Sequence, residues 1–151
     1  MRFDPYTGPA ARYYQDVRVL SSHLRGGPLD ASLSDLVEIR VSQITGCAFC
    51  LNLHAGIARR RGDSQAKLDT LAGWRESSEF TTRERSALEL AEAMTRIGDG
   101  ARVDDEVWSV ARGVFTDEEL SALIYLIGLI NVWNRINIAV QLPGNYVFPG
   151  D

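Results

Sequence analysis

The sequence predicts an all-α fold, and three observations support this prediction. Apolar residues recur at helical spacing along most of the 151 residues, whereas the alternation typical of strands is scarce. Helix start and stop signals punctuate this pattern, among them T-x-x-E capping boxes that begin at Thr81 and Thr116. A hydrophobic content of 45% in a chain of this length is enough to bury a core without disulfides. We therefore expect one compact multi-helix domain over residues 1–151.

The first two helices are expected before residue 46. Pro9 can open the first helix, which should end near Gly26-Gly27-Pro28. The second helix should begin near Asp30 and end at Gly46, because an aspartate caps a helix start and a glycine ends one. The expected apolar face of the first helix consists of Tyr13, Val17, Leu20 and Leu24.

The third and fourth helices should follow directly along the chain. The third should run from about residue 48 to 61 and stop at Gly62. Its last turn carries the run Arg59-Arg60-Arg61, whose charges should interact favourably with the C-terminal end of the helix dipole. A short fourth helix, near residues 64 to 74, should be capped by Asp63.

The capping boxes open the helices of the second half. Thr81 should start one helix, a short helix is expected around residues 104 to 112, and Thr116 should start the last. This last helix is apolar on nearly every face over residues 120–130, but asparagines from Asn131 onward interrupt the run before it reaches the length of a membrane span. We expect a central helix or an oligomer interface.

Composition and charge exclude some classes of function. The net charge of −4 argues against a surface for nucleic acid or anionic membranes, since binding phosphates needs clustered lysine and arginine. The first ten residues, MRFDPYTGPA, hold no apolar signal core, so we expect a cytoplasmic protein. In that compartment, two cysteines three residues apart are typical of catalysis or metal binding rather than of a disulfide scaffold.

The stretch GCAFCLNLH holds both cysteines of the chain, Cys47 and Cys50, and one of its two histidines, His54. If Cys47 begins the third helix, a turn of 100° per residue places Cys50 at about −60° and His54 at about −20° from it. All three side chains then share a narrow wedge at a helix N-terminus, where the dipole and a neighbouring imidazole favour a thiolate. This geometry favours a reactive Cys50 with the lower pKa, a resolving Cys47 and a base at His54.

Two other interpretations of the motif remain open. A structural zinc site needs four ligands, and His23 is the one further histidine, although its place near the end of the first helix has a simpler explanation. The cysteines could also be small buried side chains beside a satisfied histidine. We expect redox chemistry, with no metal and no cofactor.

An acidic residue that orients His54 should come from the second helix. In an antiparallel helix pair that turns at Gly46, Glu38 lies more nearly level with His54, and Asp35 lies roughly one turn farther along. Spacing alone does not choose between the two carboxylates.

The run DLVEIRVSQITGCAFCLNLHAGIARRRG resembles the signature of the carboxymuconolactone decarboxylase superfamily, in its alkylhydroperoxidase D-like branch. The resemblance extends to AGWRESSEFTTRERSALELAEAMT and to NVWNRINIAV, and thus covers about residues 30 to 140. It implies an all-helical chain that assembles through its helices into dimers, trimers or hexamers. The decarboxylase branch lacks the cysteine pair, so lactone decarboxylation is not expected.

The resemblance also implies a thiol peroxidase or a disulfide reductase. Cys50 would attack the hydroperoxide, Cys47 would resolve the sulfenic acid, and His54 would be the base; a lipoyl-bearing or thioredoxin-like protein would restore the dithiol. The acidic relay residue of the branch falls on Asp35, an aspartate in place of the usual glutamate, with Glu38 as its rival. Phe49 replaces a histidine of the best-known peroxidases. A thiol–disulfide oxidoreductase without peroxidase activity and a non-enzymatic helical interaction module are the alternatives.

Overall fold

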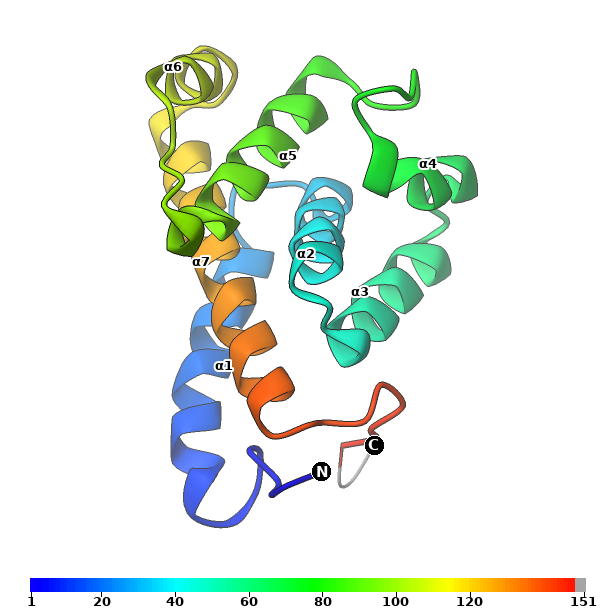
Figure 1. Cartoon of the computed structure of the whole chain (residues 1–151), viewed down its shortest axis with the longest axis vertical. Helices are drawn as coiled ribbons and strands as arrows, with labels where there is room; N and C mark the ends of the chain where they lie inside the picture. The colour runs from blue at the N-terminus through cyan, green and yellow to red at the C-terminus, as the bar shows by residue number, and fades with distance from the viewer. Residues whose placement is uncertain (149–151) are drawn as a thin grey trace.

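The computed structural model describes residues 1–148, and this part of the chain is built from α-helices, short 3-10 turns and loops (Figure 1). The all-α prediction is confirmed. Three 3-10 turns accompany the helices, at Gly8–Ala10, Leu71–Gly73 and Ile97–Asp99. The α-helices in chain order are α1 Ala11–Arg25, α2 Ala31–Thr45, α3 Ala48–Arg61, α4 Gln65–Thr70, α5 Thr82–Thr95, α6 Asp105–Val114 and α7 Asp117–Ala139.

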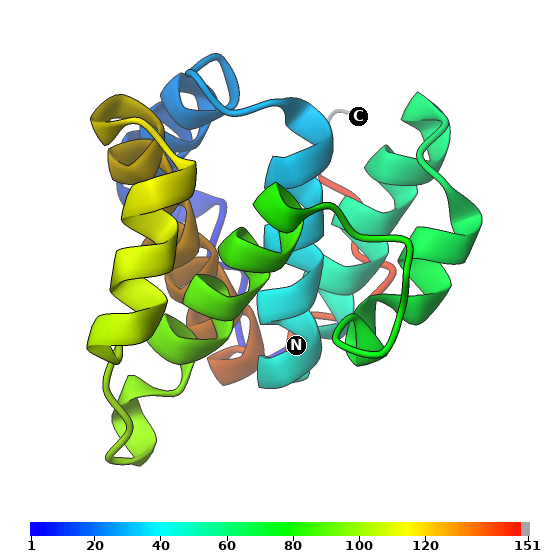
Figure 2. The same cartoon turned by 90° about the horizontal axis from the view of Figure 1, so that it is seen from above.

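Helix α2 lies at the centre of the molecule and contacts α3, α5 and α7 (Figure 2). Its Leu33, Val37 and Val41 pack into a core cluster shared with α7, and its Leu36 and Ile39 pack into a second cluster shared with α3. A helix that is covered on opposite faces must be apolar on both, which explains why α2 shows no single apolar stripe. The central position matters for function because α2 carries both candidate relay carboxylates.

The predicted helix ends are confirmed where the sequence carries capping chemistry. The side chain of Asp30 accepts the N–H of Leu33 at the start of α2. Gly46 and Gly62 end α2 and α3 in the left-handed region, with φ of 76° and 93°, where a side chain would be strained. Both capping boxes, at Thr81 and Thr116, form as predicted. Gly46 thereby reverses the chain and brings Cys47 directly to the start of α3.

Three predicted details of the early helices are wrong. Tyr13 is 60% exposed and Leu20 is 39% exposed, and Tyr14 packs against the core instead, together with Leu24 of the predicted face. The fourth helix breaks at Leu71 into α4 and a 3-10 turn. Its cap is Ser64, whose side chain accepts the N–H of Lys67, because the carboxylate of Asp63 is held by Arg61.

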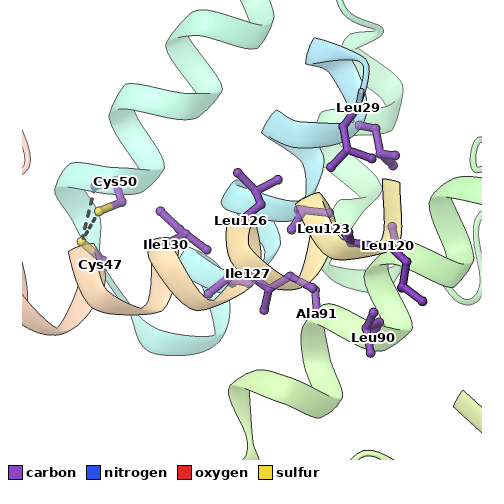
Figure 3. Close-up of a cluster of buried hydrophobic side chains, with 14 of the residues drawn as sticks. Leu29, Cys47, Cys50, Leu90, Ala91, Leu120, Leu123, Leu126, Ile127 and Ile130 are labelled. Atoms are coloured by element: carbon purple, nitrogen blue, oxygen red, sulfur yellow. Dashed lines mark hydrogen bonds between the residues drawn. The ribbon is translucent and has the colours of Figure 1, made fainter. Parts of the chain in front are cut away.

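Helix α7 supplies the longest wall of the core. Figure 3 shows its buried side chains in a row from Leu120 to Ile130, with the two cysteine sulfurs at the far end. By length and composition α7 could cross a membrane, but core helices of soluble proteins meet the same criterion, and its buried face explains the apolar sequence. The buried face of α7 is that of the predicted central helix, whereas Tyr125 is 63% exposed, and an oligomer interface on the exposed face stays a prediction.

Candidate active site

The two cysteines lie at the N-terminus of α3 as a close pair. Cys47 is the N-cap residue, and its sulfur accepts the backbone N–H of Cys50 at 3.4 Å. The two Sγ atoms are 2.9 Å apart, both thiols are free, and each residue is only 2% exposed. The spacing C-x2-C therefore brings the sulfurs together as predicted, because residues three apart lie one above the other on a helix.

The two sulfurs ionise as a coupled pair. The hydrogen bond with Cys50 lowers the pKa of Cys47 to about 7, and it raises the pKa of Cys50 together with burial. In the reduced chain this hydrogen bond favours the first ionisation at Cys47 rather than at Cys50, the sulfur predicted to have the lower pKa. At 2.9 Å a thiol on one sulfur can donate to a thiolate on the other, so the first ionisation is a property of the pair.

His54 faces two carboxylates of α2. Its Nδ1 lies 3.2 Å from Oε2 of Glu38 and 3.5 Å from Oδ1 of Asp35. All three residues are buried. The structure thus brings both predicted relay candidates to the same ring nitrogen, and Glu38 is the closer of the two. Because Nδ1 is turned toward α2, Nε2 is the nitrogen left to serve the pocket.

Two arginines neutralise this acidic pair. Arg25, in the last turn of α1, lies 2.5 Å from Glu38 and 3.3 Å from Asp35, and Arg61 of α3 lies 2.6 Å from Asp35. The carboxylates and His54 are close enough together to hold a cation, but the guanidinium groups already occupy that role. Arg61 therefore does more than oppose a helix dipole, since it pairs with the buried Asp35. Arg25 was not predicted as a site residue. The sequence shows only that it is a basic residue in the last turn of a helix.

The neighbours of His54 favour its protonated form. Burial on its own lowers the pKa of His54, but the charge of Glu38 and hydrogen bonds with Asp35 and Glu38 outweigh burial and raise the pKa to about 9. At neutral pH the ring therefore carries a proton. Among the described residues no hydrogen bond joins His54 to either sulfur, although His54 and Cys50 line the same pocket.

Asn137 of α7 is a site residue that sequence analysis missed. Its Nδ2 donates to Sγ of Cys50 at 3.4 Å, and its Oδ1 accepts the hydroxyl of Tyr6 at 2.5 Å. Burial raises the pKa of Tyr6, so its hydroxyl stays a donor and fixes the amide with Nδ2 toward the sulfur. The signal in the sequence is the set of asparagines in an otherwise apolar helix, which we used only to argue against a membrane span.

A pocket of about 170 Å³ lies beside Cys50. Cys50, His54, Glu38 and Asn137 line it, together with a group of aromatic side chains, whereas Cys47 does not. Cys50 is therefore the sulfur that a small molecule can reach. The predicted His23 is exposed in the last turn of α1, apart from these residues.

Comparisons with known proteins identify the family of the chain. A profile of the carboxymuconolactone decarboxylase family matches residues 11–93. The chain is 35% identical over 121 residues to the uncharacterised Bacillus subtilis protein YdfG. The alignment covers 80% of this chain and 82% of YdfG.

Solved structures share the fold. A protein of unknown function from Agrobacterium tumefaciens, assigned to AhpD antioxidant defence, superposes with a TM-score of 0.87 at 31% identity, over 97% of this chain and 99% of that chain. The debrominase Bmp8 superposes with a TM-score of 0.78 at 20% identity, over 87% of this chain and 70% of its own. The profile match over more than half of the sequence and the alignment with YdfG show that this chain belongs to the carboxymuconolactone decarboxylase family, with an AhpD-like all-α fold.

Proposed function

We propose that the protein is a thiol-dependent peroxidase that reduces hydroperoxides through Cys50 and Cys47, with His54 as the proton carrier. One observation carries the proposal: two thiols 2.9 Å apart lie with one sulfur, Cys50, in the wall of a pocket that is also lined by a carboxylate-bound histidine. A free thiolate in a small pocket beside an acid is what reduction of an O–O bond requires.

The first step oxidises Cys50. When Cys47 carries the proton of the pair, the Cys50 thiolate attacks the terminal oxygen of R–O–OH, so an S–O bond forms and the O–O bond breaks. Sulfur loses two electrons and the peroxide gains them. The leaving alkoxide takes a proton from His54, which the raised pKa keeps charged at neutral pH, and departs as an alcohol. The amide of Asn137 stabilises the thiolate beforehand.

The second step closes a disulfide. The Cys47 sulfur attacks the sulfenic acid on Cys50, an S–S bond forms, the S–O bond breaks, and the hydroxyl leaves as water with the Cys47 proton. The sulfurs already lie 2.9 Å apart, against about 2.05 Å in a disulfide, so little movement is needed. A dithiol reductant, lipoyl-bearing or thioredoxin-like, then exchanges with the disulfide and restores both thiols.

A thiol–disulfide oxidoreductase is the second candidate. It is favoured by the N-cap position of Cys47 and its pKa of about 7, because a low-pKa thiolate in a C-x2-C pair is also the nucleophile of disulfide exchange. Phe49, which stands between the cysteines, brings no acid or base to peroxide chemistry. Peroxide turnover distinguishes the two functions.

The decisive experiment follows peroxide consumption by the reduced protein with dithiothreitol as reductant, and locates the disulfide by peptide mass spectrometry. We expect turnover and a Cys47–Cys50 disulfide. Exchange with a model disulfide but no peroxide consumption would assign the second candidate. If the protein shows neither activity and its thiols ionise as in free cysteine, the remaining candidate is a non-enzymatic helical interaction module.

Single variants then assign the two sulfurs. In Cys47→Ser a peroxide pulse should leave a sulfenic acid on Cys50 that dimedone labels, because no resolving thiol remains. Cys50→Ser should show little label, since Cys47 does not line the pocket. His54→Ala should slow labelling of Cys50 at neutral pH. Equal labelling rates on the two sulfurs in the two serine variants would contradict the assignment.

A further inference from the structure

The pocket beside Cys50 is walled by aromatic rings that come from distant parts of the chain. Tyr6 precedes α1, Phe49 lies in α3, and Phe148 follows α7, and all three line the pocket. Tyr14 of α1 and Trp133 of α7 complete the wall. The N-terminal and C-terminal segments, which lie close together in Figure 1, thus both contribute to one site.

Most of the rings pack against one another edge to face or tilted, and Tyr14 and Phe148 are stacked at 18°. The ring centres of Tyr6 and Phe148 are 5.0 Å apart, those of Tyr6 and Trp133 are 6.3 Å apart, and Phe49 meets Phe148 at 74° with 5.9 Å between centres. This is the geometry that aromatic groups adopt with each other in protein cores. A further ring that enters the pocket can extend the same network.

The size of the pocket matches one such ring. Its volume is about 170 Å³, and an apolar protein cavity of about 150 Å³ holds one benzene molecule. Cys50, His54, Glu38 and Asn137 add polar groups to this aromatic lining, so the pocket suits an occupant with an apolar body and one polar end.

We propose that the pocket selects hydroperoxides that carry one aromatic ring next to the peroxide group. The ring packs among Trp133, Tyr14 and Phe148, and the peroxide faces Cys50. This inference rests on the proposed peroxidase function and names the substrate class of the same site. Hydrogen peroxide and small aliphatic hydroperoxides carry no ring, so they do not pack against the aromatic wall.

Two matched hydroperoxides test the selection. Cumene hydroperoxide and tert-butyl hydroperoxide differ by a phenyl group in place of a methyl group. With dithiothreitol as reductant, we expect kcat/KM to be at least tenfold higher for cumene hydroperoxide, because the additional buried apolar surface stabilises the bound state. Equal kcat/KM values for the two peroxides would overturn the inference and leave the proposed function intact.

Variants locate the selectivity. Phe148→Ala removes one wall of the pocket and should lower kcat/KM for cumene hydroperoxide several-fold more than for tert-butyl hydroperoxide. Val147→Ala is the matched control, since Val147 is the neighbouring residue, is 69% exposed and does not line this pocket. If Phe148→Ala does not change the ratio of the two kcat/KM values, the aromatic wall does not determine the selectivity.

Binding separates this inference from the peroxidase function. The alcohol product of cumene hydroperoxide, 2-phenyl-2-propanol, should bind Cys50→Ser at least tenfold more tightly than tert-butanol, as measured by ligand-observed NMR. Such binding by Cys50→Ser, together with a wild-type protein that consumes no peroxide, would retain the aromatic pocket and reject the peroxidase. Equally weak binding of the two alcohols would reject the pocket, whatever the turnover.

Discussion

At the scale of single residues, the site depends on protons that can pass between neighbours. A thiol on Cys47 or Cys50 can donate to a thiolate on the other, and Nδ1 of His54 lies between two carboxylates and Arg25. Nδ1 cannot accept from Arg25 and donate to Glu38 at the same time, so each proton transfer changes which partner the ring contacts. The residues therefore have to be tested through ionisation as well as through activity.

The thiolate titration tests the coupling of the two thiols. One thiol per chain should ionise with an apparent pKa near 7, because the partner sulfur stabilises the first negative charge, and the second should resist ionisation. Each serine variant removes the partner and should move the remaining thiol toward the ordinary value, about 8.5. Thiolate absorbance at 240 nm against pH measures both. Wild-type thiols that titrate together near 8.5 would contradict the coupling.

Asn137 should act as a positioning residue for Cys50. Asn137→Leu keeps the volume but removes the N–H donor, so the thiolate pKa should rise and oxidation of Cys50 at pH 7 should slow by roughly tenfold, the effect of about 1.4 kcal/mol. Tyr6→Phe frees the amide to turn and should have a smaller effect in the same direction.

The readout is the pH profile of dimedone labelling. If Asn137 only supports packing, the rate falls at every pH and the midpoint of the profile stays in place. A midpoint that does not move in Asn137→Leu would therefore reject the positioning role.

At the scale of elements, α5 is joined to its neighbours by one buried carboxylate. Glu92 of α5 accepts from Arg40 of α2 at 2.7 Å, from Nε1 of Trp74 at 2.9 Å and from Arg75 at 2.9 Å. Burial alone raises the pKa of Glu92, but these donors outweigh burial and lower the pKa from 4.5 to about 2. The network keeps α2, and with it the relay carboxylates, in place.

Glu92 should make stability depend on acid. Because its pKa is lower in the folded chain, its contribution is complete above pH 4.5 and is lost as pH falls toward 2. A shift of that size corresponds to about 3 kcal/mol. Glu92→Gln should therefore lower the free energy of unfolding at pH 7 by roughly that amount, with a difference from wild type that shrinks at pH 3.

Urea unfolding at the two pH values measures the effect. Glu89→Gln is the matched control, since the side chain of Glu89 is 40% exposed, lies on the same helix and also pairs with Arg75. It should change the free energy of unfolding by less than about 1 kcal/mol. A difference between Glu92→Gln and wild type that is the same at pH 7 and pH 3 would show that the carboxylate charge is not the cause.

At the scale of the whole molecule, apolar side chains remain exposed on the outer helices. Tyr125, Val132 and Ile138 of α7 and Trp108 of α6 are all exposed. Large exposed apolar residues that gather on one element mark an interaction surface. We propose that a second copy of the chain covers α7.

Light scattering at micromolar concentration should return a multiple of the 16.7 kDa chain mass. Val132→Glu places a charge in the exposed α7 surface and should shift the mass toward the monomer, whereas Ala72→Glu, at an exposed position before α5, should not. A monomer mass for the wild type would end the proposal.

The elements of the fold are predictable from the sequence wherever local chemistry decides them. Asp30, Gly46, Thr81 and Thr116 act within one helical turn, so their effects can be read without knowing the fold. Where two neighbouring residues can both cap a helix, the prediction fails. Ser64 caps α4 instead of Asp63, because Arg61 holds the carboxylate of Asp63. The side of α1 that packs on the core likewise depends on which face meets α7. The apolar periodicity does not decide whether Tyr13 or Tyr14 lies on that side.

By itself, the sequence determined the all-α class, most helix ends and the closeness of Cys47 and Cys50, because these follow from local capping and from spacing along one helix. Tertiary structure decided the rest of the site. Residues from α1, α2 and α7 reach it from more than ten positions away, and no local rule fixes how helices pack. Only that packing places Asn137 on Cys50 and gives both carboxylates to His54.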